Sequence, residues 1–316
     1  MTPSLPRGLV VNLVTPLTEA ARPDRQAFTT LIQRLKDRAS AVLVGSLSVG
    51  EGLHFSLPDR LELLATALSA GRDAPPVLFE VTGRTEEETV GLLEAAEGFL
   101  TAGEPSPPVG YLLTCLVYHS NRHLPRHLAE LGRLTARPLV LGNHPDLVRH
   151  VSKAVKHKNI RTSVLKKIAA NPQVAGLEFH GDISRAVHYQ RALVGRPDFR
   201  FYDGDEAHFL DQPSSSGLIS CGANLAVQAW MDIVHSSLDI AEGVQMVPGR
   251  LSEIWRKARL VRQLLSIYQD KPAAFLKAAL AMTGVIPSAR TADPGEALSE
   301  EETGALEMEL RACQFI

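Results

Sequence analysis

The sequence predicts an α/β fold, a (β/α)8 TIM barrel with a C-terminal helical extension. Eight short apolar runs rich in Val and Leu alternate with longer segments of helical periodicity, which is typical of βα units around a parallel sheet. Eight consecutive strand and helix pairs favour a closed barrel over an open sheet. After about residue 225 no strand pattern follows, so we expect a barrel over 1–225 and a helical domain over 226–316.

The elements can be placed from apolar runs and helix start signals. Helices are expected to begin at Ser56 as a cap and at a capping box of Thr85 and Glu88. The expected strands are 8–17, 41–45, 75–82, 109–117, 138–143, 174–180, 199–204 and 216–222. The expected C-terminal helices are 251–268, 271–284 and one near 299–315.

Bulk composition indicates an ordinary soluble globular protein. A hydrophobic content of 45%, a net charge of −2 and a pI near 6.6 provide no basic field for nucleic acid or anionic lipid. The N-terminus has no run typical of a signal peptide, and no window approaches the roughly 20 apolar residues of a membrane span. Three separated cysteines without CxxC spacing favour a reducing compartment. We therefore expect a cytoplasmic protein with no nucleic-acid or membrane partner.

In a barrel of this kind, chemistry gathers where the strands end in βα loops. Glu178 and His180 close a buried strand two residues apart, so their side chains should point the same way. The other polar or loop positions at expected strand ends are Ser48, Val49, Glu80, Thr114, Asn143, His144, Asp203, Asp205 and Ser220 to Asn224.

Several stretches, in collinear order from about residue 8 to 285, resemble the dihydrodipicolinate synthase and N-acetylneuraminate lyase family of Schiff-base aldolases. The stretches are LVTPL at 13–17, SVGE at 48–51, GNHP at 142–145, GLEFHGDISR at 176–185, DGDE at 203–206, GLISCGANLA at 217–226 and LKAALAMTG at 276–284. The resemblance implies a barrel with a C-terminal helical domain, assembled as a homodimer or homotetramer.

The resemblance also implies a reaction centre that this chain lacks. The family's imine-forming lysine falls on Glu178, or on Leu177 in a shifted alignment, and neither side chain is an amine. Its proton-moving tyrosine falls on Gly142 and its carboxylate-gripping arginine on Leu147, while its threonine pair becomes Ser48 and Val49. We therefore expect a divergent family member that does not run the Schiff-base aldol reaction, with no cofactor and no metal.

Such a member would keep a pocket for a small oxo-acid or carboxylate. The expected substrate-binding residues are Ser48, Val49, Asn143, His180, Asp203 and Ser220. An alternative is an active lyase in which Glu178 works as acid or base with His144 or His180. A structural alternative is that Glu178 fills the lysine's volume beside a basic neighbour, while His180 caps the next helix.

Other patterns allow more than one interpretation. Glu80, His144, Glu178, His180 and Asp203 include metal-binding residue types, and His119, His123 and His127 recur every four residues. Exposed histidines without a metal explain the second pattern better. The basic run 149–161 is explained better by a solvated helix face than by a site for a phosphate or an acidic partner. Lys166, Lys167 and Lys277 belong to outer or C-terminal helices and should not replace the missing amine.

Overall fold

The eight expected strands form a closed parallel barrel in chain order, so the predicted fold class is confirmed. The computed structural model describes residues 5–71, 73–102, 108–115, 120–151 and 157–316. The strands are β1 (Gly8–Asn12), β2 (Ala41–Val44), β3 (Val77–Glu80), β4 (Val109–Cys115), β5 (Leu139–Asn143), β6 (Val174–Phe179), β7 (Arg200–Asp203) and β8 (Gly217–Ser220). Each strand is shorter than its expected range.

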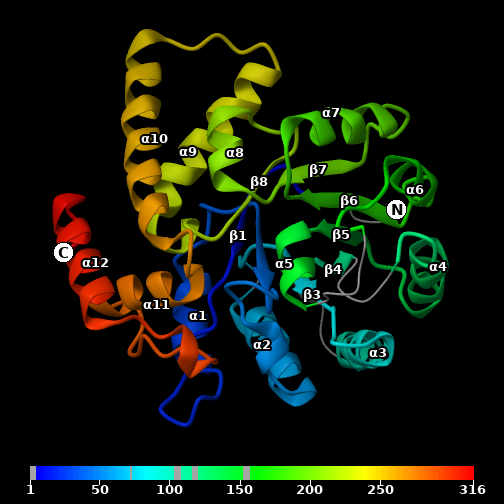
Figure 1. Ribbon diagram of the computed structural model, residues 1–316, viewed down its shortest axis with the longest axis horizontal. Helices are drawn as coiled ribbons and strands as arrows, with labels where there is room; N and C mark the ends of the chain where they lie inside the picture. Colours follow the sequence, from blue (N-terminus) through cyan, green and yellow to red (C-terminus); the bar gives the residue numbers. More distant parts are fainter. Residues whose placement is uncertain (1–4, 72, 103–107, 116–119, 152–156) are drawn as a thin grey trace. The chain divides into compact units, whose positions relative to one another are not determined.

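Helices follow the strands and continue after β8 (Figure 1). They are α1 (Arg25–Gln33), α2 (Leu57–Ser69), α3 (Glu86–Ala102), α4 (Leu124–Leu134), α5 (Pro145–Val151), α6 (Thr162–Ile168), α7 (Ile183–Ala192), α8 (Glu206–Asp211), α9 (Ala223–Ala241), α10 (Pro248–Tyr268), α11 (Pro272–Met282) and α12 (Glu300–Ala312), with short 3-10 turns η1 (Gly52–His54) and η2 (Pro294–Glu296). None of the helices in the described ranges combines the length and apolarity that a membrane crossing requires.

The helix start signals work largely as expected. The Ser56 hydroxyl accepts from the Asp59 amide at the start of α2, and the Thr85 hydroxyl accepts from the Glu88 amide at the start of α3. The Glu88 carboxylate, however, accepts from the amide of Arg84 rather than of Thr85, so the reciprocal half of the predicted capping box is displaced by one residue.

The chain divides into two compact units, each described here by itself. Unit 1 comprises Met1–Arg7 and Leu78–Ile219, with strands β4 to β7, β3 except Val77, and β8 except Ser220. Unit 2 comprises Gly8–Val77 and Ser220–Ile316, with β1, β2 and the C-terminal helices. The boundary expected near 225 lies at the start of α9 and stays a prediction.

In unit 2, α9 packs on β1 and against α10 and α11, and α11 also contacts α12. The large side chain of Trp230 on α9 is 1% exposed and anchors this core. α9 buries Val227 and Val234 together with Trp230, while Gln228 and His235 are exposed, so the helix is amphipathic.

Candidate functional site

The register of unit 1 lines up the carboxyl ends of its strands. Thr114 on β4 pairs with Gly142 on β5, which pairs with Glu178 on β6. One residue further on, Asn143 pairs with Phe179, which pairs with Asp203 on β7. The last residues of neighbouring strands therefore lie side by side at the carboxyl-terminal edge of the sheet, as in other barrels of this kind.

Glu178 and His180 form a buried acid and imidazole pair at the end of β6. His180 Nε2 lies 3.3 Å from Glu178 Oε1, so the two side chains point the same way, as their spacing predicts. The Glu178 side chain is 8% exposed and that of His180 is 19% exposed. The partner of Glu178 is therefore His180 itself.

His144, which follows β5, stacks on His180. The ring centroids lie 3.9 Å apart with an angle of 25° between the planes. The backbone amide of Leu147 donates to His144 Nδ1 at 3.2 Å, which assigns an unprotonated Nδ1 and hence a neutral ring to His144. A neutral imidazole can lie face to face with a protonated one without charge repulsion.

The pKa of His180 is set by opposing effects. Burial lowers it, but the hydrogen bond to Glu178 and the charges of Glu178, Asp205 and Asp203 together outweigh burial, so the pKa of His180 is raised. The raised pKa favours the protonated form of His180, whose positive charge lies beside the Glu178 carboxyl group. Gly204 is needed beside them, since a Cβ there would lie 2.2 Å from His180 Nε2.

Asn143 holds the loops around the pair. Its amide nitrogen donates to Asn159 Oδ1 at 3.0 Å and to the carbonyl of His180 at 3.1 Å. Its amide oxygen accepts from the Ile160 amide at 2.9 Å and from the Tyr189 hydroxyl at 3.3 Å. These four bonds use the whole hydrogen-bonding capacity of an Asn side chain, which is 1% exposed at the residue level.

Glu80 at the end of β3 is 1% exposed. Its carboxylate accepts from the Thr114 hydroxyl at 3.1 Å and from the Thr82 amide at 3.2 Å, and also from the Thr82 hydroxyl. These neutral donors stabilise the buried carboxylate.

A second acid and imidazole pair follows β7. His208 Nδ1 on α8 lies 2.5 Å from Asp203 Oδ2, and the Asp205 amide donates to Asp203 Oδ1 at 3.2 Å. Burial raises the pKa of Asp203 to about 6, although the bond to His208 opposes the shift. His208 Nε2 is buried and has no hydrogen-bond partner in the part of the chain that the structure describes.

The raised pKa of Asp203 predicts a pH dependence of stability. The folded state favours the protonated Asp203 carboxyl group. Its contribution to the free energy of unfolding is therefore complete below the unfolded pKa of 3.8 and is lost as the pH rises through the folded pKa of about 6. Between pH 4 and 8 the wild type should lose on the order of 3 kcal/mol more than Asp203→Asn in urea unfolding. Asp270→Asn, at an exposed position, is the control. Equal pH profiles for wild type and Asp203→Asn would contradict the expectation.

The remaining expected residues belong to unit 2. The Asn12 amide nitrogen donates to Ser48 Oγ at 3.3 Å, and Asn12 Oδ1 is buried without a partner among the described residues. Val49 is 1% exposed. The Ser220 hydroxyl accepts from the Ala223 amide at 3.0 Å at the start of α9. Ser48, Val49 and Ser220 keep their predicted binding roles as predictions, as do Asn143, His180 and Asp203 in unit 1.

Two alternative interpretations are corrected. Asp182, not His180, caps α7, because its carboxylate accepts from the Arg185 amide at 2.8 Å. His123 precedes α4 and His127 lies buried within it, so they do not form an exposed helical stripe, and His119 lies outside the described residues. Among described residues no three His, Cys, Asp or Glu side chains lie close enough to hold a metal.

Sequence reasoning missed three residues that complete the site. His208 joins Asp203 from a helix, while Asn159 and Tyr189 reach Asn143 from two different segments. None of these spacings follows a strand or helix period. Of the three, only Asn159 lies within a pattern noted in the sequence, the basic run 149–161.

Comparisons with known proteins place the whole chain in one family. The model of the dihydrodipicolinate synthetase family matches residues 5–313. The chain belongs to this family. It is 23% identical over 312 residues to a 4-hydroxy-tetrahydrodipicolinate synthase from Mesorhizobium japonicum, covering 89% of this chain and 99% of that one. It is also 26% identical over 240 residues to the enzyme of that name from Salinibacter ruber, covering 74% of each.

Solved structures of the dihydrodipicolinate synthetase family have the same fold. A monomeric dihydrodipicolinate synthase variant aligns with a TM-score of 0.82 at 18% identity, covering 99% of this chain and 98% of that one. A prophage protein of the family from E. coli K12, solved with pyruvate, has a TM-score of 0.82 at 19% identity, covering 98% and 99%. Assembly as a homodimer or homotetramer and a cytoplasmic location stay predictions for this chain.

Proposed function

We propose that this family member binds a small oxo-acid or related carboxylate at the carboxyl ends of its strands without forming an imine. The observation that carries the proposal is the Glu178 and His180 pair at the end of β6, where the family resemblance calls for an amine. A carboxylate cannot attack a keto carbon to form an imine. Gly142 and Leu147, in place of tyrosine and arginine, support the same conclusion.

Charge balance explains how an anion could be accepted beside Glu178. An isolated buried carboxylate would repel a second one, but protonated His180 compensates it. The raised pKa of His180 keeps that proton in place nearer to neutral pH. The imidazolium face toward His144 is already covered by the stacked ring, so a ligand carboxylate would approach its remaining edge.

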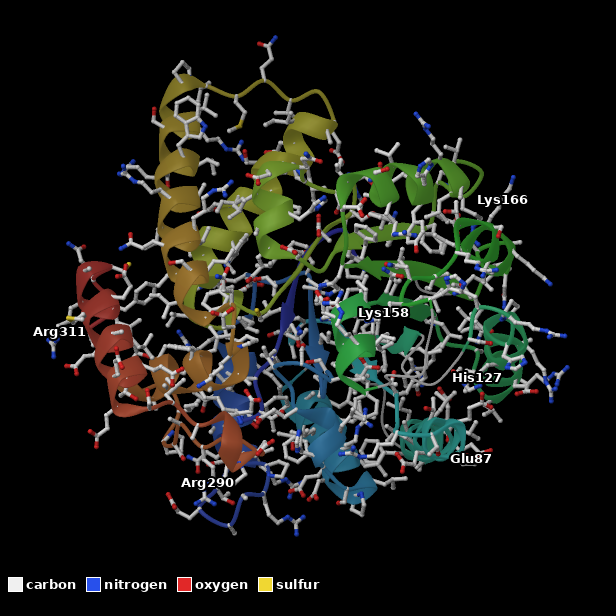
Figure 2. All side chains as sticks on the ribbon, in the orientation of Figure 1. Glu87, His127, Lys158, Lys166, Arg290 and Arg311 are labelled. Carbon is white, nitrogen blue, oxygen red and sulfur yellow. The ribbon has the colours of Figure 1, made fainter. Side chains whose placement is uncertain are left out.

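Other described lysines are poorly placed to supply the missing amine. No strand of the barrel ends in lysine. Lys166 and Lys167 are exposed on α6, where Figure 2 labels Lys166. Lys277 is fully buried and bonded to Glu51. Lys158, next to Asn159, is half-buried and is the position to inspect if an imine forms.

Borohydride trapping tests the proposal. The full chain is incubated with pyruvate and sodium borohydride, and its intact mass is compared with a sample without pyruvate. We expect an unchanged mass, together with saturable heat of pyruvate binding in calorimetry. A stable adduct, mapped by peptide digestion to Lys158 or any other lysine, would refute the absence of an imine, and the lack of saturable binding of any small oxo-acid would refute the pocket.

A second candidate function uses the same pair. A carboxylate hydrogen-bonded to an imidazole of raised pKa is suited to proton transfer, so Glu178 with His180 or His144 could serve an altered lyase reaction as acid and base. In that case Glu178→Gln should abolish turnover while ligand binding remains. A metal-assisted form has weaker support, because no three-ligand cluster occurs among the described residues.

A further inference from the structure

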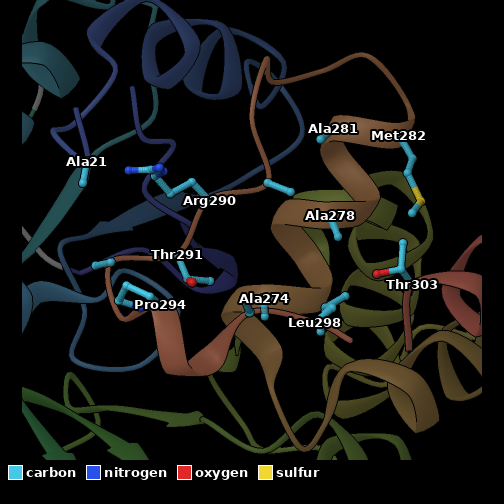
Figure 3. Close-up of a pocket in the computed structure, with 13 residues that line it drawn as sticks. Ala21, Ala274, Ala278, Ala281, Met282, Arg290, Thr291, Pro294, Leu298 and Thr303 are labelled. Carbon is cyan, nitrogen blue, oxygen red and sulfur yellow. The ribbon is translucent and has the colours of Figure 1, made fainter. Parts of the chain in front are cut away.

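A cavity of about 480 Å³ lies in unit 2, and none of the strand-end residues discussed above is part of its wall (Figure 3). This volume is within the range of small-molecule sites. Its wall is formed by Ala21, Ala274, Ala278, Ala281, Met282, Ala289, Arg290, Thr291, Ala292, Pro294, Ala297, Leu298 and Thr303. They come from α11, the segment between α11 and α12, the start of α12 and the turn before α1.

The cavity exists because one face of α11 carries only small side chains. Ala274, Ala278 and Ala281 are spaced by four and three residues, which places them on the same side of the helix. Met282 at the end of α11 contributes a flexible apolar side chain to the wall. The interior therefore suits an apolar chain rather than a polar metabolite.

Arg290 is the one charged residue among those that line the cavity. Its Nη1 donates to the carbonyl of Glu19 at 2.9 Å, and Figure 3 shows the side chain extending toward Ala21. No carboxylate pairs with Arg290 in the described part of the chain. An arginine has five donor hydrogens in a planar fork, so this guanidinium retains donors for an anionic group.

Hydrogen bonds to the buried Lys277 and Glu51 side chains hold the loop that carries Arg290. Lys277 Nζ donates to the Arg290 carbonyl at 3.0 Å and to the Glu51 carboxylate, and the Ala292 amide donates to Glu51 Oε1 at 2.6 Å. Both members of this ion pair are buried. The wall is thus largely formed before a ligand arrives, which reduces the entropic cost of binding.

We propose that this cavity is a binding site for a small amphiphilic monocarboxylate, whose apolar chain lies against the alanine face of α11 and whose carboxylate pairs with Arg290. The inference rests on the cavity, its lining and the charge at its edge. It does not depend on the function proposed for the strand ends, and a pocket at those ends could be absent while this one binds.

Calorimetry of the full chain with octanoate tests the site, with octanol and butyrate as neutral and short probes. Octanoate should bind more tightly than either. Ala278→Phe, which fills the cavity, should weaken octanoate roughly tenfold or more. Arg290→Gln should weaken octanoate about tenfold and leave octanol unchanged, because it removes a charge-assisted hydrogen bond.

Two exposed positions on α12 provide matched controls, Ala312→Phe and Arg311→Gln (Figure 2 labels Arg311). Both should bind octanoate like the wild type. Thermal unfolding checks that Ala278→Phe is folded. If that variant does not fold, Arg290→Gln still tests the site, because Arg290 is exposed and its replacement should leave the fold intact. The proposal would be overturned if octanoate did not bind the wild type. It would also be overturned if octanoate bound Arg290→Gln with the same affinity as the wild type.

Discussion

Replacing Lys277 with Met is expected to lower the free energy of unfolding by about 3–5 kcal/mol, the usual cost of removing one member of a buried ion pair. Lys277 is 0% exposed, and its Nζ bonds the Glu51 carboxylate and the Arg290 carbonyl. Burial lowers the pKa of Lys277, although Glu51 opposes this. Without the ammonium, Glu51 would remain a buried charge. Urea unfolding at neutral pH measures the loss.

Two further variants separate the charge effect from packing. Lys277→Met combined with Glu51→Gln should recover part of the lost stability, because no unpaired charge remains. Lys271→Met removes a pair with Glu302 in which both side chains are about one-third exposed, so it should cost no more than about 1 kcal/mol. Equal losses for Lys277→Met and Lys271→Met would contradict the role given to the buried pair.

The same pair has a consequence for the Ser48 loop of unit 2. Glu51 has a left-handed backbone, with φ of 54°, and directly follows Gly50, whose amide donates to Ser46 Oγ at 2.9 Å. Ser48 belongs to this turn. Losing the Lys277 contact should therefore loosen the loop that carries a predicted binding hydroxyl.

Replacing Glu178 with Gln is expected to weaken pyruvate binding about tenfold at neutral pH. The amide keeps the shape of the side chain but removes the hydrogen bond and charge that raise the pKa of His180. Burial then has less opposition, so the pKa of His180 falls relative to the wild type and the ring holds its proton less strongly. Calorimetry measures the affinity, and NMR titration of the imidazole measures the pKa.

The pH profile has a defined sign. Carboxylate binding by the wild type should be strong below the raised pKa of His180 and should decline as the pH rises through it. In Glu178→Gln the decline should occur at lower pH. The control is Glu97→Gln, a half-buried carboxylate on α3 that accepts from the Tyr111 hydroxyl at 2.7 Å.

These outcomes distinguish the two candidate functions. Unchanged pyruvate binding in Glu178→Gln would refute the charge-balance explanation. If turnover of some substrate disappeared while binding persisted, the acid and base function would be favoured instead. If binding and turnover both matched the wild type, Glu178 would have neither role.

The amino-acid sequence by itself determined the fold and where along the chain each strand lies. Eight apolar runs became eight strands, because a parallel barrel buries both faces of each strand and so requires continuous apolar segments. The spacing of Glu178 and His180 also predicted their contact, since alternate residues of a strand share a side. These features depend on local periodicity, which a single sequence displays directly.

Only the tertiary structure decided the partners that come from other segments. His144 stacks on His180 because Asn143 and Phe179 are paired in register on neighbouring strands. His208 reaches Asp203 from a helix, and Lys277 reaches Glu51 across 226 residues. No periodicity in the chain encodes such distances. They arise because buried charges must find partners wherever the folded backbone brings a complementary group close.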